Sequence, residues 1–170
     1  MFIDTRRTVL LPEYHVVEAT AEPRIIVPFF GPDRKIISWI ARDYTGTLIP
    51  KYTQAPGAKP MFMLPRWEPV DTLVLVEGVF DAFAVASCGH AVAAIGGTHL
   101  SSRSEQDLRQ LVRRRITILL DNDEAGQRAM PKLRDRLRDR YDVVSNSHLL
   151  PPDCDPAQVH PKDLIAALRR

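Results

Sequence analysis

Acidic side chains follow two apolar runs of the sequence, at the point where each run ends. Glu77 comes directly after the run Leu73–Val76, and Asp121 and Asp123 come directly after the run Ile116–Leu120. Carboxylate oxygens are the ligands that Mg²⁺ and Mn²⁺ prefer in proteins. If the fold brings the two run ends together, these residues can hold a divalent ion.

Other carboxylates can join the same group. Asp81 stands one helical turn beyond Glu77, and a proline-rich loop near the end of the chain carries Asp153 and Asp155. Carboxylates that converge without cations repel one another, so a cluster of this kind favours a divalent ion that also bridges to substrate phosphates. Alone, each motif has a plainer interpretation, because an Asp-x-Asp after a strand commonly forms a turn or caps a helix.

Buried strands alternating with helices must position these acids. The pattern predicts strands over 73–76, 91–95, 116–120 and from 143, and helices over 79–88, 101–114, 124–140 and 162–168. Such alternation is typical of right-handed crossovers and a mainly parallel sheet. Because reactive groups collect at the carboxyl ends of parallel strands, the acids are expected at one edge of the sheet.

The first part of the chain has a different pattern. Two apolar runs, 24–30 and 35–42, flank a Gly-Pro-Asp turn and predict an antiparallel hairpin, with a third strand over 47–52. A proline-rich stretch over 54–69 is expected to be a loop or linker. The expected organisation is therefore a small β-rich subdomain, residues 1–70, followed by an α/β domain, residues 71–170.

A glycine pair follows the predicted strand over 91–95. Gly97 and Thr98 precede a helix that Ser101 or Ser102 can cap, and free N–H groups at such a place can hold phosphate. A tight turn explains the same residues equally well.

The composition excludes several classes of protein. A chain of 170 residues that is 45% hydrophobic and 26% charged can bury a core. Its net charge of +2 is too small to indicate a negatively charged partner. The apolar runs are too short for a membrane span, and two cysteines are too few for a zinc ribbon, so no zinc is expected in this chain. No signal-peptide pattern opens the sequence, and a cytoplasmic location is expected.

Together, the motifs resemble a TOPRIM domain. The resemblance rests on Val76-Glu77-Gly78-Val-Phe-Asp81, on the strand that ends at Gly97-Thr98, and on Leu120-Asp121-Asn-Asp123-Glu-Ala-Gly126. This domain is shared by bacterial-type primases, topoisomerases and some nucleases. The resemblance implies that the Glu and the Asp-x-Asp hold Mg²⁺ at a phosphoryl-transfer centre.

The sequence before the TOPRIM-like segment indicates which group of TOPRIM proteins the chain resembles most. The hairpin and the segment Pro50-Lys51-Tyr52 are similar to the subdomain before TOPRIM in bacterial and phage (DnaG-like) primases. The resemblance implies DNA-templated RNA primer synthesis with two Mg²⁺ or Mn²⁺ ions. The catalytic residues it implies are Glu77, Asp81, Asp121 and Asp123; the metal ligands are Glu77, Asp121, Asp123, Asp153 and Asp155; the nucleotide or template contacts are Arg24, Arg42, Lys51, Tyr52, Gly97 and Thr98.

The expected partners are a single-stranded DNA template, nucleoside triphosphates and a replicative helicase in the same or another chain, with no membrane. The chain is expected to be a minimal core or a fragment of a phage, plasmid or bacterial replication protein. Two alternatives stay open: a TOPRIM-type metal-dependent nuclease, and a non-catalytic nucleic-acid-binding accessory module.

The arginine-rich stretch 128–140 first indicates a solvated helix face with Arg–Asp pairs.

Overall fold

The structure, a computed structural model, describes residues 3–4, 23–64 and 67–169. The chain divides into two units, Met1–Lys59 and Pro60–Arg170. Each unit has its own sheet, and the two units are described separately.

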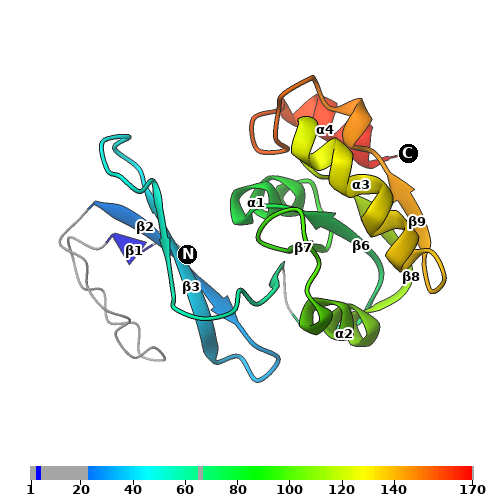
Figure 1. Cartoon of the computed structure of the whole chain (residues 1–170), viewed down its shortest axis with the longest axis horizontal. Helices are drawn as coiled ribbons and strands as arrows, with labels where there is room; N and C mark the ends of the chain where they lie inside the picture. The colour runs from blue at the N-terminus through cyan, green and yellow to red at the C-terminus, as the bar shows by residue number, and fades with distance from the viewer. Residues whose placement is uncertain (1–2, 5–22, 65–66, 170) are drawn as a thin grey trace. The chain divides into compact units, whose positions relative to one another are not determined.

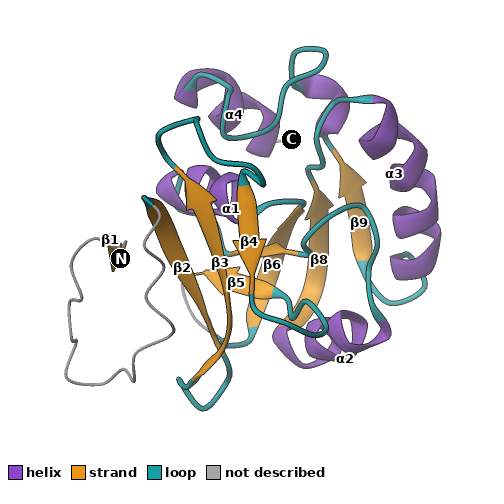
Figure 2. Cartoon of the chain, turned by 60° about the vertical axis from the view of Figure 1, so that its left-hand side comes forward, coloured by secondary structure: helices purple, strands orange, loops and turns teal. Residues whose placement is uncertain are grey.

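Unit 1 is built on an antiparallel sheet in the order β1-β2-β3-β4 (Figure 2). The strands β2 (Arg24–Phe30) and β3 (Ile36–Asp43) form the hairpin that the sequence predicts, closed by a hydrogen bond from the Gly31 N–H to the Lys35 carbonyl oxygen. Strand β1 (Ile3–Asp4) pairs with β2. Most of the segment over 1–23, where one or two short strands were expected, lies outside the described residues.

The third strand of unit 1 begins later than predicted. Strand β4 covers Tyr52–Gln54 rather than 47–52, and it places Tyr52 opposite Arg42 of β3. The Asp43 carboxylate accepts hydrogen bonds from the N–H groups of Thr45 (2.7 Å) and Leu48 (2.9 Å). These bonds fold the residues between Asp43 and Leu48, which precede β4, into a loop, so their backbone does not join the sheet.

Unit 2 contains a five-stranded sheet in the order β5-β7-β6-β8-β9 (Figure 1). Four strands are parallel: β6 (Val70–Val76), β7 (Val92–Ala94), β8 (Val112–Ile118) and β9 (Asp142–Ser145). Edge strand β5 (Phe62–Leu64) runs antiparallel to β7. The predicted fold class, a mainly parallel sheet with helices preceded by a β-rich subdomain, is confirmed.

The boundary between the units lies earlier than the expected position near residue 70. Strand β5 falls inside the proline-rich stretch that was expected to be a linker, and it belongs to the second sheet. Phe62 and Met63 are buried there. A three-residue strand is too short for its alternation to be visible in a sequence.

Four helices connect and flank the strands of unit 2: α1 (Val79–Ser87), α2 (Ser102–Leu111), α3 (Glu124–Leu137) and α4 (Pro161–Leu168), with a short 3₁₀ helix, η1 (Ser147–Leu149). Ser101 caps α2, as one of the two predicted caps, by accepting a hydrogen bond from the Ser104 N–H at 3.0 Å. Helix α2 ends before the predicted position because the chain enters β8 at Val112, opposite Val70.

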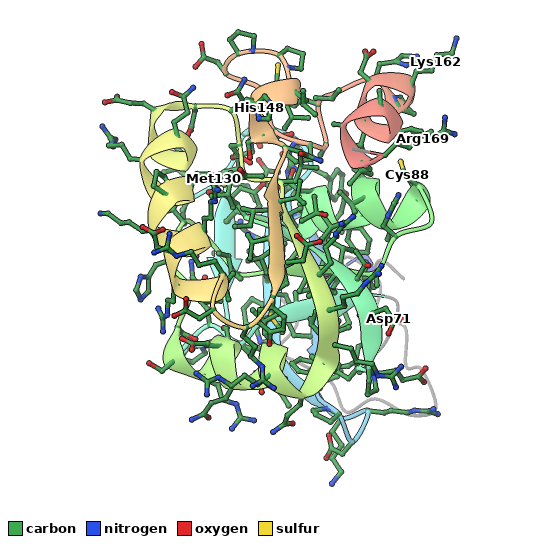
Figure 3. The ribbon with its side chains drawn as sticks, turned by 90° about the vertical axis from the view of Figure 1, so that its right-hand side faces the viewer. Asp71, Cys88, Met130, His148, Lys162 and Arg169 are labelled. Atoms are coloured by element: carbon green, nitrogen blue, oxygen red, sulfur yellow. The ribbon has the colours of Figure 1, made fainter. Side chains whose placement is uncertain are left out.

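The helices cover both faces of this sheet. Alternate side chains of β6 point to opposite faces, so that Leu73 and Leu75 belong to the core that Leu108 of α2 and Leu133 of α3 complete. Figure 3 shows α1 and α4 on the opposite side of the sheet from α2 and α3. None of the helices within the described residues has the length and apolar character needed to cross a bilayer.

Candidate active site

Two neighbouring parallel strands deliver Glu77 and Asp121 to the same edge of the sheet. Strands β6 and β8 pair with Leu75 opposite Ile118, and each acid follows the end of its strand. In Figure 3, Asp71 near the start of β6 lies low and His148 beyond β9 lies high, so the carboxyl ends point upward. The Asp121 N–H donates to Oε1 of Glu77 at 3.3 Å. The structure thus brings the two acids into contact.

Asp81 links the first turn of α1 to the loop that contains the later acids. Its side chain is buried, with 6% exposed. One carboxylate oxygen accepts from the Gly78 N–H (3.0 Å) and the other from the Ala157 N–H (3.2 Å). Because both oxygens are engaged by backbone groups, Asp81 is suited to positioning the site.

Asp123 and Asp155 each combine a structural role with a place at the site. Oδ1 of Asp123 caps α3 by accepting from the Gly126 N–H at 2.8 Å, so the cap interpretation of this residue is correct. Oδ1 of Asp155 accepts from the Gln158 N–H at 2.8 Å. Each bond uses one of the two carboxylate oxygens.

The loop of Leu150–Gln158, here called the acidic loop, carries Asp153 and Asp155. Asp153 is exposed and has a backbone φ of 56°, and its N–H donates to the Asn122 carbonyl oxygen at 2.9 Å. The hydrogen bond ties the acidic loop directly to the segment between Asp121 and Asp123.

Burial and like charge together raise the pKa values of the central acids. Burial, followed by the charge of Asp121, raises the pKa of Glu77 to about 7. Burial and the charges of Asp121 and Asp155 raise the pKa of Asp81 to about 7. Burial, with the charges of Asp155 and Asp123, raises the pKa of Asp121 to about 6. The carboxylates therefore repel one another at neutral pH.

The donor set fits a hard divalent cation. Oδ1 of Asp121 is buried without a hydrogen-bond partner in the described part of the chain, and a bound cation would satisfy it. Over residues 3–4, 23–64 and 67–169, no three His, Cys, Asp or Glu side chains already stand in a metal-binding arrangement. Binding of an ion by three of these side chains would require them to change position.

Gly126 is a site residue to which the sequence analysis gave no role. A Cβ at this position would lie 2.1 Å from the Asp121 carbonyl oxygen and 3.3 Å from Oε1 of Glu77. Only glycine allows the start of α3 to lie this close to the strand ends. The signal available in the sequence was a glycine in the first turn of a helix, where alanine is more stable.

The glycine loop after β7 lies beside the same edge. The Gly96 N–H donates to the Glu77 carbonyl oxygen at 2.9 Å, and Gly97 has a φ of 143°, which favours glycine. Thr98 follows and is half-buried. The structure brings this loop next to Glu77.

In unit 1, three of the residues predicted to contact nucleotide or template lie close together. The Arg42 guanidinium carbon lies 5.5 Å from the centre of the Tyr52 ring, and the Lys51 ammonium lies 5.8 Å from it. Cations at these distances are attracted to an aromatic face. Arg42, Lys51 and Tyr52, here called the basic cluster, thus form one group on β3 and β4.

Arg24 differs from the expectation that it contacts nucleotide or template. Only 1% of its surface is exposed, and its guanidinium donates to the carbonyl oxygens of Pro50 (2.9 Å) and Lys51 (3.2 Å). Burial of an arginine costs little free energy only when its N–H donors have hydrogen-bond acceptors, as they do here. Arg24 therefore holds the segment that carries the basic cluster.

Several arginines of α3 and its C-cap residue, Arg138, pair with acids, as the solvated-face interpretation predicts. Arg128 pairs with Glu124, and Arg138 pairs with Asp135 at 3.3 Å. Arg136 instead reaches α2, where it contacts Glu105 at 2.6 Å.

The fold of the chain is similar to those of several solved structures. The chain is similar to the primase of Aquifex aeolicus (zinc-binding and RNA polymerase domains), with 26% identity and a TM-score of 0.69 over 86% of this chain and 38% of that one. It is similar to the E. coli primase catalytic core, with 21% identity and a TM-score of 0.69 over 86% and 50% of the two chains. It is also similar to the RNA polymerase domain of Mycobacterium tuberculosis primase, with 22% identity and a TM-score of 0.62 over 86% and 53%.

The chain thus spans between about a third and a half of these solved chains. No curated protein matches it in sequence. The model of one family, described as Toprim-like, matches residues 74–160, which is just over half of the chain and includes the strand-end acids and the acidic loop. The chain belongs to the Toprim-like family.

Proposed function

We propose that this chain is a primase catalytic core that synthesises RNA primers on a DNA template. The observation that carries the proposal is the contact between Glu77 and Asp121 at the ends of adjacent parallel strands, with the Oδ1 atom of Asp121 buried and unpartnered. The similarity of the fold to primase catalytic cores supports it.

In this proposal the metal ligands come from both sides of the sheet edge. Asp121 and Asp123 supply oxygens from the strand end, and Asp153 and Asp155 supply them from the acidic loop. Bound Mg²⁺ or Mn²⁺ supplies activation of the attacking hydroxyl and neutralisation of charge on phosphate oxygens, and two ions are expected.

Glu77 and Asp81 have different parts. Glu77 either joins the ligands or accepts the proton of the attacking 3′-hydroxyl. Asp81 orients the site through its bonds to the Gly78 and Ala157 N–H groups.

The reaction joins the 3′-oxygen of the primer to the α-phosphorus of a nucleoside triphosphate. The bond between the α-phosphorus and the bridging oxygen breaks, and pyrophosphate leaves. Arg42 and Lys51 neutralise phosphates of the nucleotide or template, Tyr52 stacks on a base, and the Gly97–Thr98 loop binds phosphate through backbone N–H groups.

The proposed partners are single-stranded DNA and nucleoside triphosphates. One similar structure is a DnaG primase catalytic domain bound to single-stranded DNA, and another is the Mycobacterium tuberculosis domain in complex with double-stranded DNA. For this chain we propose a template role for single-stranded DNA, in the cytoplasm of a bacterial or phage-infected cell. A replicative helicase is the proposed protein partner.

Product length tests the proposal. The full chain is incubated with end-labelled single-stranded DNA and Mn²⁺, with and without nucleoside triphosphates, and new RNA is followed with an α-labelled nucleotide. RNA that appears only with template, triphosphates and metal supports primer synthesis. Shortened DNA without triphosphates would instead establish a nuclease, and binding without either product would establish an accessory module.

A further inference from the structure

The acidic loop has few regular hydrogen bonds of its own to hold it at the site. It follows η1 and precedes α4, and no strand or helix covers Pro151–His160. Asp153 adopts a φ of 56°, which few residues other than glycine, asparagine and aspartate tolerate. Contacts from outside the loop must therefore fix where Asp153 and Asp155 lie.

Asn122 provides most of these contacts. Its N–H donates to the Cys154 carbonyl oxygen at 3.0 Å, and its carbonyl oxygen accepts from the Asp153 N–H at 2.9 Å. Its side-chain Nδ2 donates to the Leu150 carbonyl oxygen at 2.8 Å. A single residue therefore bonds to the loop at three points.

The orientation of the Asn122 amide follows from its neighbours. A carbonyl oxygen only accepts hydrogen bonds, so the nitrogen must face Leu150. The opposite atom, Oδ1, accepts from Nε2 of Gln127 at 3.3 Å. Both ends of the side chain thus have a defined partner.

The position of Asn122 in the sequence gives these bonds a consequence for the site. It stands between Asp121 and Asp123, so a displacement of the acidic loop from Asn122 is a displacement of one group of acids from the other. The second attachment of the loop is the Asp81 bond to the Ala157 N–H, which the Asn122 side chain does not touch.

We propose that Asn122 is a positioning residue. Its side chain holds the acidic loop next to the strand-end acids, so that the acids of the loop and those at the strand ends can bind the same divalent ions. The proposal rests on the proposed function of the acids as metal ligands. It gives the central residue of the Asp-x-Asp motif a separate role, because that residue contributes an amide donor rather than a ligand.

The test compares Asn122→Ala with Gln127→Ala in the full chain. Asn122→Ala removes the donor to Leu150 and keeps both backbone bonds, whereas Gln127→Ala removes only the exposed partner of Oδ1. Hydrogen–deuterium exchange reports on the loop, and electron paramagnetic resonance of free Mn²⁺ reports metal binding without requiring activity. Primer synthesis is measured alongside as a function of Mn²⁺ concentration.

We expect Asn122→Ala to increase exchange in residues 150–158 and to weaken Mn²⁺ binding about three- to tenfold, the effect of one side-chain hydrogen bond. Exchange in β6 should stay unchanged, and synthesis should recover at saturating Mn²⁺. Gln127→Ala should change each quantity less than about twofold.

Three results would overturn the proposal: unchanged exchange in the acidic loop, a uniform increase across the sheet, or faster loop exchange with unaltered Mn²⁺ affinity. Failure of the proposed function looks different, because the wild-type chain would then bind Mn²⁺ but make no RNA. If the wild type binds no Mn²⁺ at all, both proposals fail together.

Discussion

Removing one charge from the acidic site should make the metal-free protein more stable. We choose Asp121→Asn, because Asp121 contacts Glu77 and its charge acts on both Glu77 and Asp81. Its own folded-state pKa, about 6, lies above its ordinary value of 3.8. The protonated form therefore favours folding, and this contribution is complete below about pH 4 and lost as the pH rises through 6.

The size of the effect follows from the shift. A difference of about two pKa units corresponds to roughly 3 kcal/mol at most, since each unit is worth about 1.4 kcal/mol. Asp121 is half-buried, so solvent screens part of this, and we expect a net gain of about 1–2 kcal/mol at about pH 8. For a chain of 170 residues that gain raises Tm by about 2–8 °C.

The assay is thermal unfolding followed by circular dichroism in the presence of EDTA. Near pH 4 the gain should fall below about 0.5 kcal/mol, because the Asp121 carboxyl is then protonated in the folded state and already partly protonated in the unfolded state. The control is Asp135→Asn, an exposed acid of α3 that pairs with Arg138 and lies outside the site, for which a change within about 0.5 kcal/mol is expected. A lower Tm for Asp121→Asn at about pH 8, or an equal gain at both pH values, would refute the reasoning.

Three further variants test other parts of the structure. Gly126→Ala should destabilise unit 2 by roughly 2 kcal/mol or more in urea unfolding, although alanine is the better helix former, because its Cβ would lie 2.1 Å from the Asp121 carbonyl oxygen. A more stable variant would show that the close approach is absent. Arg136→Ala should lower the free energy of unfolding by about 1 kcal/mol in the same measurement, since the variant loses the bonds of Arg136 to α2 and to the loop before α2. Arg134→Ala, on the same helix, should lower it by less than about 0.5 kcal/mol. Equal losses would argue against the Arg136 contacts. Lys51→Ala should weaken binding of single-stranded DNA about three- to tenfold and lower the slope of log Kd against log salt by about one unit, measured by fluorescence anisotropy. An unchanged slope would exclude a phosphate contact by Lys51.

The larger elements could be predicted because burial dictates their residue patterns. The short apolar run Leu73–Val76 is typical of a strand buried on both faces, and the run that begins at Ile116 has the same pattern; both segments form strands. Once these strands are parallel neighbours, Glu77 and Asp121 have to meet at one edge. The contact between them is therefore a consequence of the sequence pattern and the topology.

The details that the sequence did not reveal depend on contacts between distant segments. Arg24 was expected to contact nucleotide or template, but its guanidinium donates hydrogen bonds to the carbonyl oxygens of Pro50 and Lys51, far along the chain. Strand β5 exists because β7 offers an edge, which its three residues cannot signal alone. No role for Asn122 could be predicted, since its partners lie in a loop whose position no local pattern specifies.

The most direct test of the account is incorporation of labelled nucleotide into RNA by the wild-type chain and by Glu77→Gln. Both are assayed on single-stranded DNA with saturating Mn²⁺, and circular dichroism confirms that both are folded. We predict template-dependent RNA from the wild type and a loss of at least about a hundredfold in the variant, because the carboxylate that binds metal or accepts the hydroxyl proton is gone. Equal synthesis by the two proteins, or none by the wild type, would contradict the assignment of the strand-end acids as a primase active site.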